Sequence, residues 1–200
     1  MTRPLAAGRA PDRSLGDPDR LDVAAAQRDR AAFGVLYRRY LDRVYAYSFY
    51  LLGDHHDAED VTERTFLAAL ASLHRFRDRG SSFRAWLFRI AHNEVANALR
   101  GRTRRRRRTV PMGELEVPSL PAASAAVDPA QEVDRIDDAR RVRRALETLA
   151  DDRRHVLVLR FVDGLSAGEI GEVLGRSAGA VRVLQHRALR DLAERLGTER

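Results

Sequence analysis

The 200-residue sequence contains no cysteine and no lysine. Without cysteine the chain can form no disulfide, no thiolate metal site and no thiol nucleophile, which is typical of a cytoplasmic protein. No apolar run reaches the length of a membrane span, and the N-terminal residues carry no hydrophobic signal core. We therefore expect a cytoplasmic protein that does not insert into a membrane.

Because lysine is absent, all 36 basic side chains are arginine, against 29 acidic side chains, and the formal net charge is +7. A positive balance of this size favours a polyanionic partner. The planar guanidinium group also suits phosphate and guanine. Nucleic acid is the leading candidate.

The chain divides into segments of different composition. Residues 1–21 are rich in Pro, Gly, Asp and Arg without an apolar period, which predicts a disordered tail. Residues 22–103 and 132–198 show helical spacing of apolar side chains, and residues 104–131, with an arginine run and several prolines, have the composition of a linker. No alternating strand pattern is present. The sequence predicts an all-α fold of two small helical domains joined by a flexible linker.

Three main helices are expected in the N-terminal domain. Apolar residues recur at three- and four-residue steps over residues 33–51 and predict the first helix, which Gly53 ends. The second helix begins with Asp54 or Asp57 as its cap, and the nearby acids favour its positive end. The third begins behind the serine pair at 81–82.

A helix-turn-helix is the sharpest signal in the C-terminal domain. Ser166 and Glu169 form a capping box, Gly175 can end the short helix in a left-handed conformation, and Ser177 caps a longer basic helix. The second helix of this motif lies in the DNA major groove, with its early residues at the base edges. An ordinary helical hairpin with solvated arginines is the alternative, and the net charge favours DNA. The candidate DNA-binding residues here are Arg176, Ser177, Arg182, His186, Arg187 and Arg190.

The stretch GDHHDAEDVTERTF, residues 53–66, concentrates histidines and acids. His55 with Glu59, or His56 with Asp60, has the helical spacing to share a metal ion. A capped helix start explains the same acids without a cofactor. We therefore expect neither a metal nor another cofactor.

Two sets of motifs, in this order and with a Pro-rich linker between them, resemble a known family. DAEDVTERTFLAAL and FRAWLFRIAHNEVANALRGR are similar to the second region of the extracytoplasmic-function (ECF) sigma factors, which belong to the sigma-70 family and are two-domain initiation subunits of bacterial RNA polymerase. ALETLADDRRHVLVLRFVDGLSAGEIGEVLGRSAGAVRVLQHRAL is similar to their fourth region.

The resemblance implies where polymerase and DNA bind. The helix from Asp57 to Leu70 would dock on the largest polymerase subunit, through Asp57, Glu59, Asp60, Glu63 and Phe66. The third helix would hold single-stranded bases of the minus-ten element, which requires basic, flat and polar groups. Its candidate DNA-binding residues are Arg84, Arg89, His92, Asn93, Asn97 and Arg100. In the family, Asn93 and the loop at 74–83 would shape the pocket for a flipped base.

The resemblance therefore predicts a non-enzymatic sigma factor that binds core RNA polymerase and promoter DNA. The C-terminal domain would recognise the minus-thirty-five element, and the N-terminal domain would melt the minus-ten element. An anti-sigma factor often controls such proteins. The alternative is a stand-alone helix-turn-helix regulator. A metal-dependent enzyme built on the His-Asp cluster would lack distributed ligands and an activated nucleophile.

Overall fold

The computed structural model describes residues 17–77, 80–106 and 144–198. Within these ranges the regular elements are helices and there is no strand, which confirms the all-α prediction. None of the described helices is long and apolar enough to cross a membrane. Most of the predicted tail and linker lies outside the described residues.

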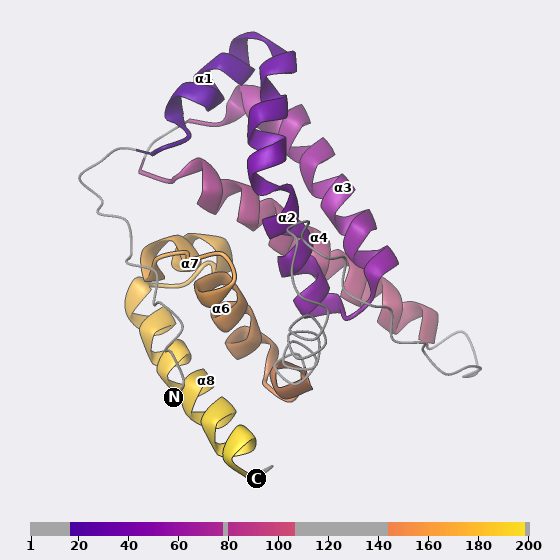
Figure 1. Ribbon diagram of the computed structural model, residues 1–200, viewed down its shortest axis with the longest axis vertical. Coiled ribbons are helices and arrows are strands. Elements are labelled where there is room, and N and C mark those ends of the chain that lie inside the picture. Colours follow the sequence, from indigo (N-terminus) through magenta and orange to yellow (C-terminus); the bar gives the residue numbers. More distant parts are fainter. Residues whose placement is uncertain (1–16, 78–79, 107–143, 199–200) are drawn as a thin grey trace, which may run out of the picture.

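The first part of the chain forms an N-terminal body in which α2, α3 and α4 lie alongside one another and α1 packs at one end of α2 (Figure 1). Its elements are α1 (Arg20–Arg28), the 3-10 turn η1 (Arg30–Ala32), α2 (Phe33–Leu52), α3 (His55–Ser72), the 3-10 turn η2 (Leu73–Arg75) and α4 (Phe83–Arg106). Large apolar side chains such as Leu36, Phe83 and Phe88 are fully buried between these helices. Their burial supplies the main driving force for the body.

The helix boundaries of this body follow the caps expected from the sequence. Gly53 ends α2 with φ 70°, in the left-handed region that suits glycine. The Asp54 carboxylate accepts the Asp57 N–H at 2.9 Å and caps α3, and Ser82 Oγ accepts the Ala85 N–H at 3.2 Å at the start of α4. At its other end α4 continues to Arg106, three residues into the segment predicted as linker.

The folded chain also begins before the predicted tail ends, because part of residues 17–21 belongs to the N-terminal body. Asp19 is buried and accepts a hydrogen bond from the Tyr40 hydroxyl. Asp17 accepts the Phe83 N–H at 2.6 Å. These contacts join positions far apart in the sequence, so no local apolar period reveals them.

The C-terminal body contains α6 (Asp151–Phe161), α7 (Ala167–Leu174) and α8 (Ala178–Thr198), preceded by a helical turn at residues 144–147. α8 packs on both α6 and α7. Fully buried Leu159, Leu165 and Ile170, together with Val181 of α8, form its core. The helix-turn-helix predicted from the capping residues is therefore present.

The two bodies contact each other through α7 against α4 and through α6 against α2. In Figure 1, α6 and α7 lie between the N-terminal body and α8, which forms the outer edge of the molecule. This packing decides which of the predicted DNA-binding side chains remain accessible.

Candidate functional site

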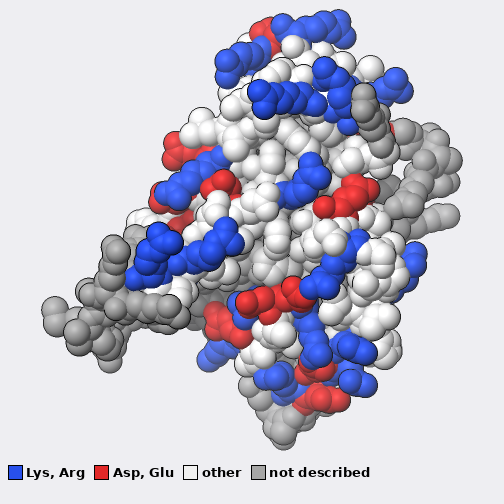
Figure 2. All heavy atoms as spheres, turned by 180° about the vertical axis from the view of Figure 1, so that it is seen from behind, with Lys and Arg blue, Asp and Glu red and all other residues white. Residues whose placement is uncertain are grey.

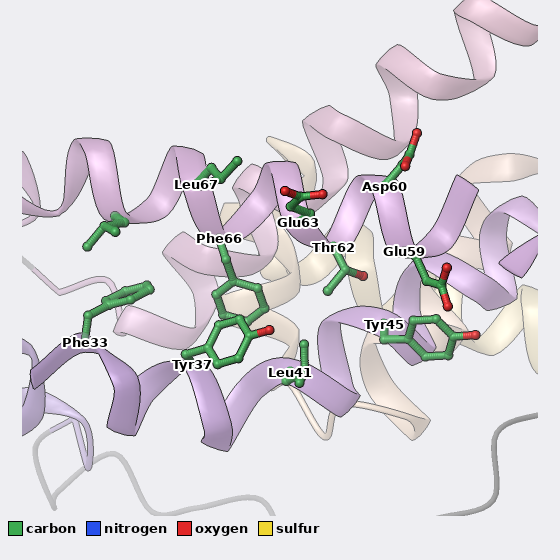
Figure 3. Close-up of a pocket in the computed structure, with 11 residues that line it drawn as sticks. Phe33, Tyr37, Leu41, Tyr45, Glu59, Asp60, Thr62, Glu63, Phe66 and Leu67 are labelled. Atoms are coloured by element: carbon green, nitrogen blue, oxygen red, sulfur yellow. The ribbon is translucent and has the colours of Figure 1, made fainter. Parts of the chain in front are cut away.

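A groove of about 690 Å³ runs between α2 and α3. Figure 3 shows side chains of α2 along one wall and side chains of α3 along the other. The lining residues are Phe33, Tyr37, Leu41 and Tyr45 from α2, and Glu59, Asp60, Thr62, Glu63, Phe66, Leu67 and Leu70 from α3.

The groove combines an apolar floor with an acidic wall. The Tyr37 ring packs edge-on against Phe66 with centroids 4.8 Å apart, and Phe66 itself is buried. Leu67 is 58% exposed, and the three acids beside it, Glu59, Asp60 and Glu63, are exposed. On a chain with a net positive charge, this arrangement fits a partner helix that carries apolar and basic side chains.

Asp57 differs from the other four residues predicted for docking, because its carboxylate is engaged within the fold. It forms an ion pair with Arg102 of α4, and Arg102 Nη1 also donates to the Leu52 carbonyl at 2.6 Å. Asp57 does not line the groove. Its position indicates a structural role in joining three helices.

The two histidines beside these acids have different surroundings. His55 Nδ1 is hydrogen-bonded to the Tyr45 hydroxyl, and its ring centroid lies 4.4 Å from that of Phe49. The His56 side chain is 95% exposed, with Nδ1 3.9 Å from the Glu59 carboxylate. Across the described parts of the chain, no group of three or more His, Asp or Glu side chains is arranged to hold a metal ion.

Four of the predicted promoter-binding residues form an exposed stripe along α4. Arg89, Asn93, Asn97 and Arg100 recur at three- and four-residue steps and all are exposed. Arg100 Nη2 donates to Asn97 Oδ1 at 2.6 Å. The stripe combines cationic and amide groups, which can contact phosphates and base edges respectively.

The other two predicted residues of α4 point towards the C-terminal body. Arg84 Nη2 donates to both carboxylate oxygens of Glu169 at 2.8 Å. His92 Nδ1 lies 3.1 Å from His155 Nδ1, and burial lowers the pKa of His92 below its ordinary value. In this arrangement Arg84 and His92 are occupied by protein contacts.

Aromatic residues near the start of α4 belong mainly to the core. Phe83 is fully buried, and Phe76 is 7% exposed. Trp86 is half-buried against both rings, with centroids 5.1 Å from Phe76 and 5.6 Å from Phe83. A base could therefore stack only on the outer part of this cluster.

The helix-turn-helix is built by reciprocal caps and a tight turn. Glu169 Oε2 accepts the Ser166 N–H at 2.8 Å, and Ser166 Oγ accepts the Glu169 N–H at 3.3 Å. Gly175 has φ 65°, and Ser177 Oγ accepts the Ala180 N–H at 3.1 Å to begin α8. These contacts fix the direction in which α8 leaves the turn.

α8 presents a basic outer face. Val181 and Ala188 are fully buried on its inner side, whereas the predicted DNA-binding residues Arg182, His186, Arg187 and Arg190 are exposed. Arg190 Nε lies 3.8 Å from the Glu194 carboxylate one turn later. In the turn before α8, Ser177 is exposed as a cap and Arg176 pairs with Asp152.

The surface charge is spread widely over the molecule. Figure 2 shows arginines across the whole face seen from behind, with acidic side chains interspersed among them. The net charge therefore does not single out one binding face, and the α4 stripe and the outer face of α8 remain the candidate DNA-binding surfaces.

Comparison with known proteins gives the family. Residues 36–105 match the family model "Sigma-70 region 2", and residues 145–194 match "Sigma-70, region 4". The ECF RNA polymerase sigma factor ShbA of Streptomyces griseus is 39% identical over 142 residues, which are 70% of this chain and 73% of that protein. The chain belongs to the ECF sigma factors. The family match to region 2 disfavours the stand-alone regulator.

Further relatives of this ECF sigma factor support the assignment. The ECF sigma factor BldN of Streptomyces coelicolor is 38% identical over 175 residues, 87% of this chain, and the chain spans 64% of that relative's length. The solved structure of CnrH in complex with the cytosolic domain of CnrY has 28% identity and a TM-score of 0.68, covering 91% of this chain and 99% of that one. The sigma factor RpoE of Bartonella quintana, in complex with the anti-sigma factor NepR, has 26% identity and a TM-score of 0.65. The match covers 84% of this chain and 98% of that one.

The sequence did not reveal several residues that contribute to the contacts of this sigma factor. Glu169 was assigned only a capping role, and its pairing with Arg84 links positions 85 residues apart. Tyr47 and His155 belonged to predicted apolar helix faces, and their hydrogen bond joins the two bodies. Tyr37 lies one turn after Phe33, and this spacing could have indicated that it extends the apolar floor of the groove.

Proposed function

We propose that this ECF sigma factor binds core RNA polymerase in the cytoplasm and directs transcription initiation at specific promoters. The observation that carries the proposal is the combination, on one chain, of an acidic apolar groove on the N-terminal body with a basic helix-turn-helix on the C-terminal body. The chain itself performs no chemistry, since polymerase makes the RNA. We propose an N-terminal domain of residues 17–106, which extends the predicted 22–103 at both ends, and a C-terminal domain of residues 132–198.

The groove between α2 and α3 is the proposed polymerase-docking surface. Glu59, Asp60 and Glu63 would face basic side chains of the polymerase, while Tyr37 and Leu67 would cover apolar ones. Such a surface uses charge for orientation and buried apolar area for affinity. The exposure of the three acids supports this assignment.

Promoter DNA would contact both bodies. On α4, Asn93 and the neighbouring arginines Arg89 and Arg100 would hold the unpaired strand of the minus-ten element. On α8, Arg182 and His186 lie in the early turns, where side chains reach base edges in the major groove. Arg190 lies further along and would contact phosphate.

We also propose that an anti-sigma factor regulates this chain. The structural neighbour RpoE was solved with the anti-sigma factor NepR, and CnrH with the cytosolic domain of CnrY. Such a partner would compete for the surfaces that polymerase uses.

The test of the proposed function is core polymerase binding by the double variant Asp60→Arg/Glu63→Arg. We expect capture by core polymerase and promoter-specific transcription to fall together, because two attractive contacts become repulsive. The matched control is Asp42→Arg/Asp151→Arg, which makes the same charge change at exposed positions outside the groove. Circular dichroism must show both variants to be as helical as the parent. Binding of the groove variant at the parental level would refute the docking assignment.

A further inference from the structure

The contact between the two bodies is centred on Glu169 of α7. Its Oε1 accepts hydrogen bonds from Arg84 Nη2 and Ser82 Oγ, both at 2.8 Å, and its Oε2 accepts a second bond from Arg84 Nη2 at 2.8 Å. The side chains of Arg84 and Glu169 are only 16% and 14% exposed. Ion pairs that are shielded from water and share two hydrogen bonds are the stronger ones.

Glu169 is ionised in this position. Burial by itself disfavours the charged carboxylate, but hydrogen bonds from the Ser166 N–H and Ser82 and the charge of Arg84 outweigh burial and lower the pKa of Glu169. A charged acceptor therefore faces the guanidinium of Arg84 at neutral pH. We call Arg84, Glu169 and Ser82 together the latch.

A second contact between the bodies is a neutral cluster of Tyr47, His92 and His155. The Tyr47 hydroxyl lies 3.2 Å from His92 Nδ1 and 3.0 Å from His155 Nδ1. These side chains come from α2, α4 and α6, so the cluster joins α2 and α4 of the N-terminal body to α6 of the C-terminal body. Because its polar atoms satisfy one another, they can be buried at low cost.

A buried acid opposes this packing. Asp163, between α6 and α7, is fully buried, and neither of its carboxylate oxygens has a hydrogen-bond partner within the described residues. The charges that act on it come from the N-terminal body, from Arg43 on α2 and Arg84 on α4, yet burial dominates and raises the pKa of Asp163 well above its usual range. Burying an unpaired carboxyl group destabilises the closed packing, and separation of the bodies would rehydrate it.

We propose that the latch holds a self-inhibited closed form of the chain, in which Glu169 withholds Arg84 from promoter DNA until the C-terminal body moves away. The inference rests on the proposed function, to which it adds a DNA contact of Arg84, a predicted DNA-binding residue on the same helix as Arg89 and Asn93. In the closed packing the Nε and Nη2 atoms of Arg84 are bonded to Glu169 and its side chain is only 16% exposed, so a phosphate cannot reach it. Closure and promoter binding therefore compete for one side chain, while the α4 stripe stays exposed.

Two substitutions should shift the ratio of open to closed molecules in opposite directions. Glu169→Gln keeps an oxygen that can accept the Ser166 N–H in the capping box, but it removes the charge that holds Arg84, so it should favour the open form. Asp163→Asn keeps the shape but does not titrate, so closure no longer requires the carboxylate to take up a proton, and this variant should favour the closed form. Asp42→Asn, at an exposed position on α2, also replaces a carboxylate with an amide and should have no effect.

The measurement is the distribution of distances between spin labels at Ala71→Cys on α3 and Ala193→Cys on α8, in the full-length chain without polymerase. Both positions are exposed, and the absence of native cysteine makes the labelling specific. We expect Glu169→Gln to raise the ratio of open to closed molecules by about tenfold, the effect of one charge-assisted hydrogen bond. We expect Asp163→Asn to lower it.

A variant in the N-terminal body distinguishes opening of the chain from a local disturbance of α7 caused by the Glu169 substitution. Arg84→Gln leaves the α7 cap intact and should open the chain as much as Glu169→Gln. The double variant should open it no further, because both changes remove one interaction. A distance distribution unchanged in Glu169→Gln, or additive effects of the two changes, would overturn the latch.

The inhibitory role is tested with a forked promoter DNA that carries an unpaired minus-ten strand. With Glu169→Gln, its affinity for the full chain should rise in step with the open fraction. If the chain opens without any gain in DNA affinity, self-inhibition is wrong. Failure of the proposed function would be distinguishable, because it would appear as parental polymerase binding by Asp60→Arg/Glu63→Arg.

Discussion

At the scale of single residues, the partner of a charged side chain decides its role. Arg100 and Arg102 lie two positions apart on α4. Arg100 is exposed and donates to Asn97 of the same helix. Arg102 pairs with Asp57 of α3 and donates to the Leu52 carbonyl at the end of α2. Arg102 thus satisfies a helix-end carbonyl that α2 itself cannot satisfy.

We predict that Arg102→Ala lowers the free energy of unfolding by about 1–3 kcal/mol, because it leaves a partly buried carboxylate and a carbonyl without their donor. Arg100→Ala is the matched control and should change that free energy by about 0.5 kcal/mol or less, as expected for an exposed position. Urea unfolding followed by circular dichroism measures both. Equal losses in the two variants would contradict the assigned role of Arg102.

The ion pair between Arg102 and Asp57 shows why the sequence alone could not assign the role of each acid. Asp57, Glu59 and Asp60 are neighbouring acids, and all three were predicted for docking. Only the folded chain brings Arg102 to Asp57, since 45 positions separate them. Spacing rules describe neighbours within one helix, so they cannot separate an acid engaged by a distant arginine from an exposed one.

At the scale of the elements, prediction succeeded where the signals are local. Gly53, Asp54 and the Ser166–Glu169 capping box act on backbone groups within four residues, so the boundaries they set could be predicted from the sequence. α1 was not predicted as a separate helix because it is short and buries only Val23 and Ala26.

Gly171 is an element-scale feature that has no sequence signal. It lies inside α7, and a Cβ atom there would meet the Arg176 carbonyl oxygen at 2.5 Å. The turn after α7 can therefore approach the helix closely only if residue 171 is glycine. The close approach of this turn to α7 also allows the Arg176 N–H to donate a hydrogen bond to the Gly171 carbonyl at 2.9 Å.

We predict that Gly171→Ala destabilises the chain by about 1–3 kcal/mol, as overpacking does, and weakens binding to a minus-thirty-five duplex. Gly179→Ala on α8 is the control. Its Cβ would make an ordinary 3.9 Å contact with Ser177 Oγ, so the better helix propensity of alanine should stabilise by about 0.5 kcal/mol. Thermal unfolding and duplex binding by polymerase holoenzyme measure both effects. If both variants were stabilised, the close approach at residue 171 would be wrong.

At the scale of the whole molecule, the packing of the two bodies was beyond sequence reasoning. His92 was predicted to bind DNA and His155 belonged to an apolar run, and neither position indicated that they meet. Their Nδ1 atoms lie 3.1 Å apart across the contact. Such a pairing depends on how the two helical bodies pack against each other, and only a few side chains decide it.

This contact makes stability depend on pH. Burial above all lowers the pKa of His155 to about 3, and the neighbouring His92 and Arg154 act in the same direction. The packed chain therefore keeps His155 neutral, whereas a chain that opens or unfolds exposes a histidine with a pKa of about 6.5. Above pH 6.5 neither state binds the proton. Below it, only the exposed state does, so stability is lost progressively as the pH falls from about 6.5 towards 3.

We predict that lowering the pH from 7 to 5 costs the parent about 2 kcal/mol more unfolding free energy than it costs His155→Gln. Glutamine retains an amide that can bond to the Tyr47 hydroxyl but does not titrate. Asp163 has the opposite pH dependence, because its raised pKa favours the packed chain in acid, and the lowered pKa of Glu169 acts in the same direction as His155. Both acids are present in the two proteins, so their contributions cancel in the difference. Urea unfolding at pH 7, 6 and 5 measures this difference in unfolding free energy between the parent and the variant. Parallel pH profiles for the two proteins would mean that His155 is already accessible to protons in the folded chain.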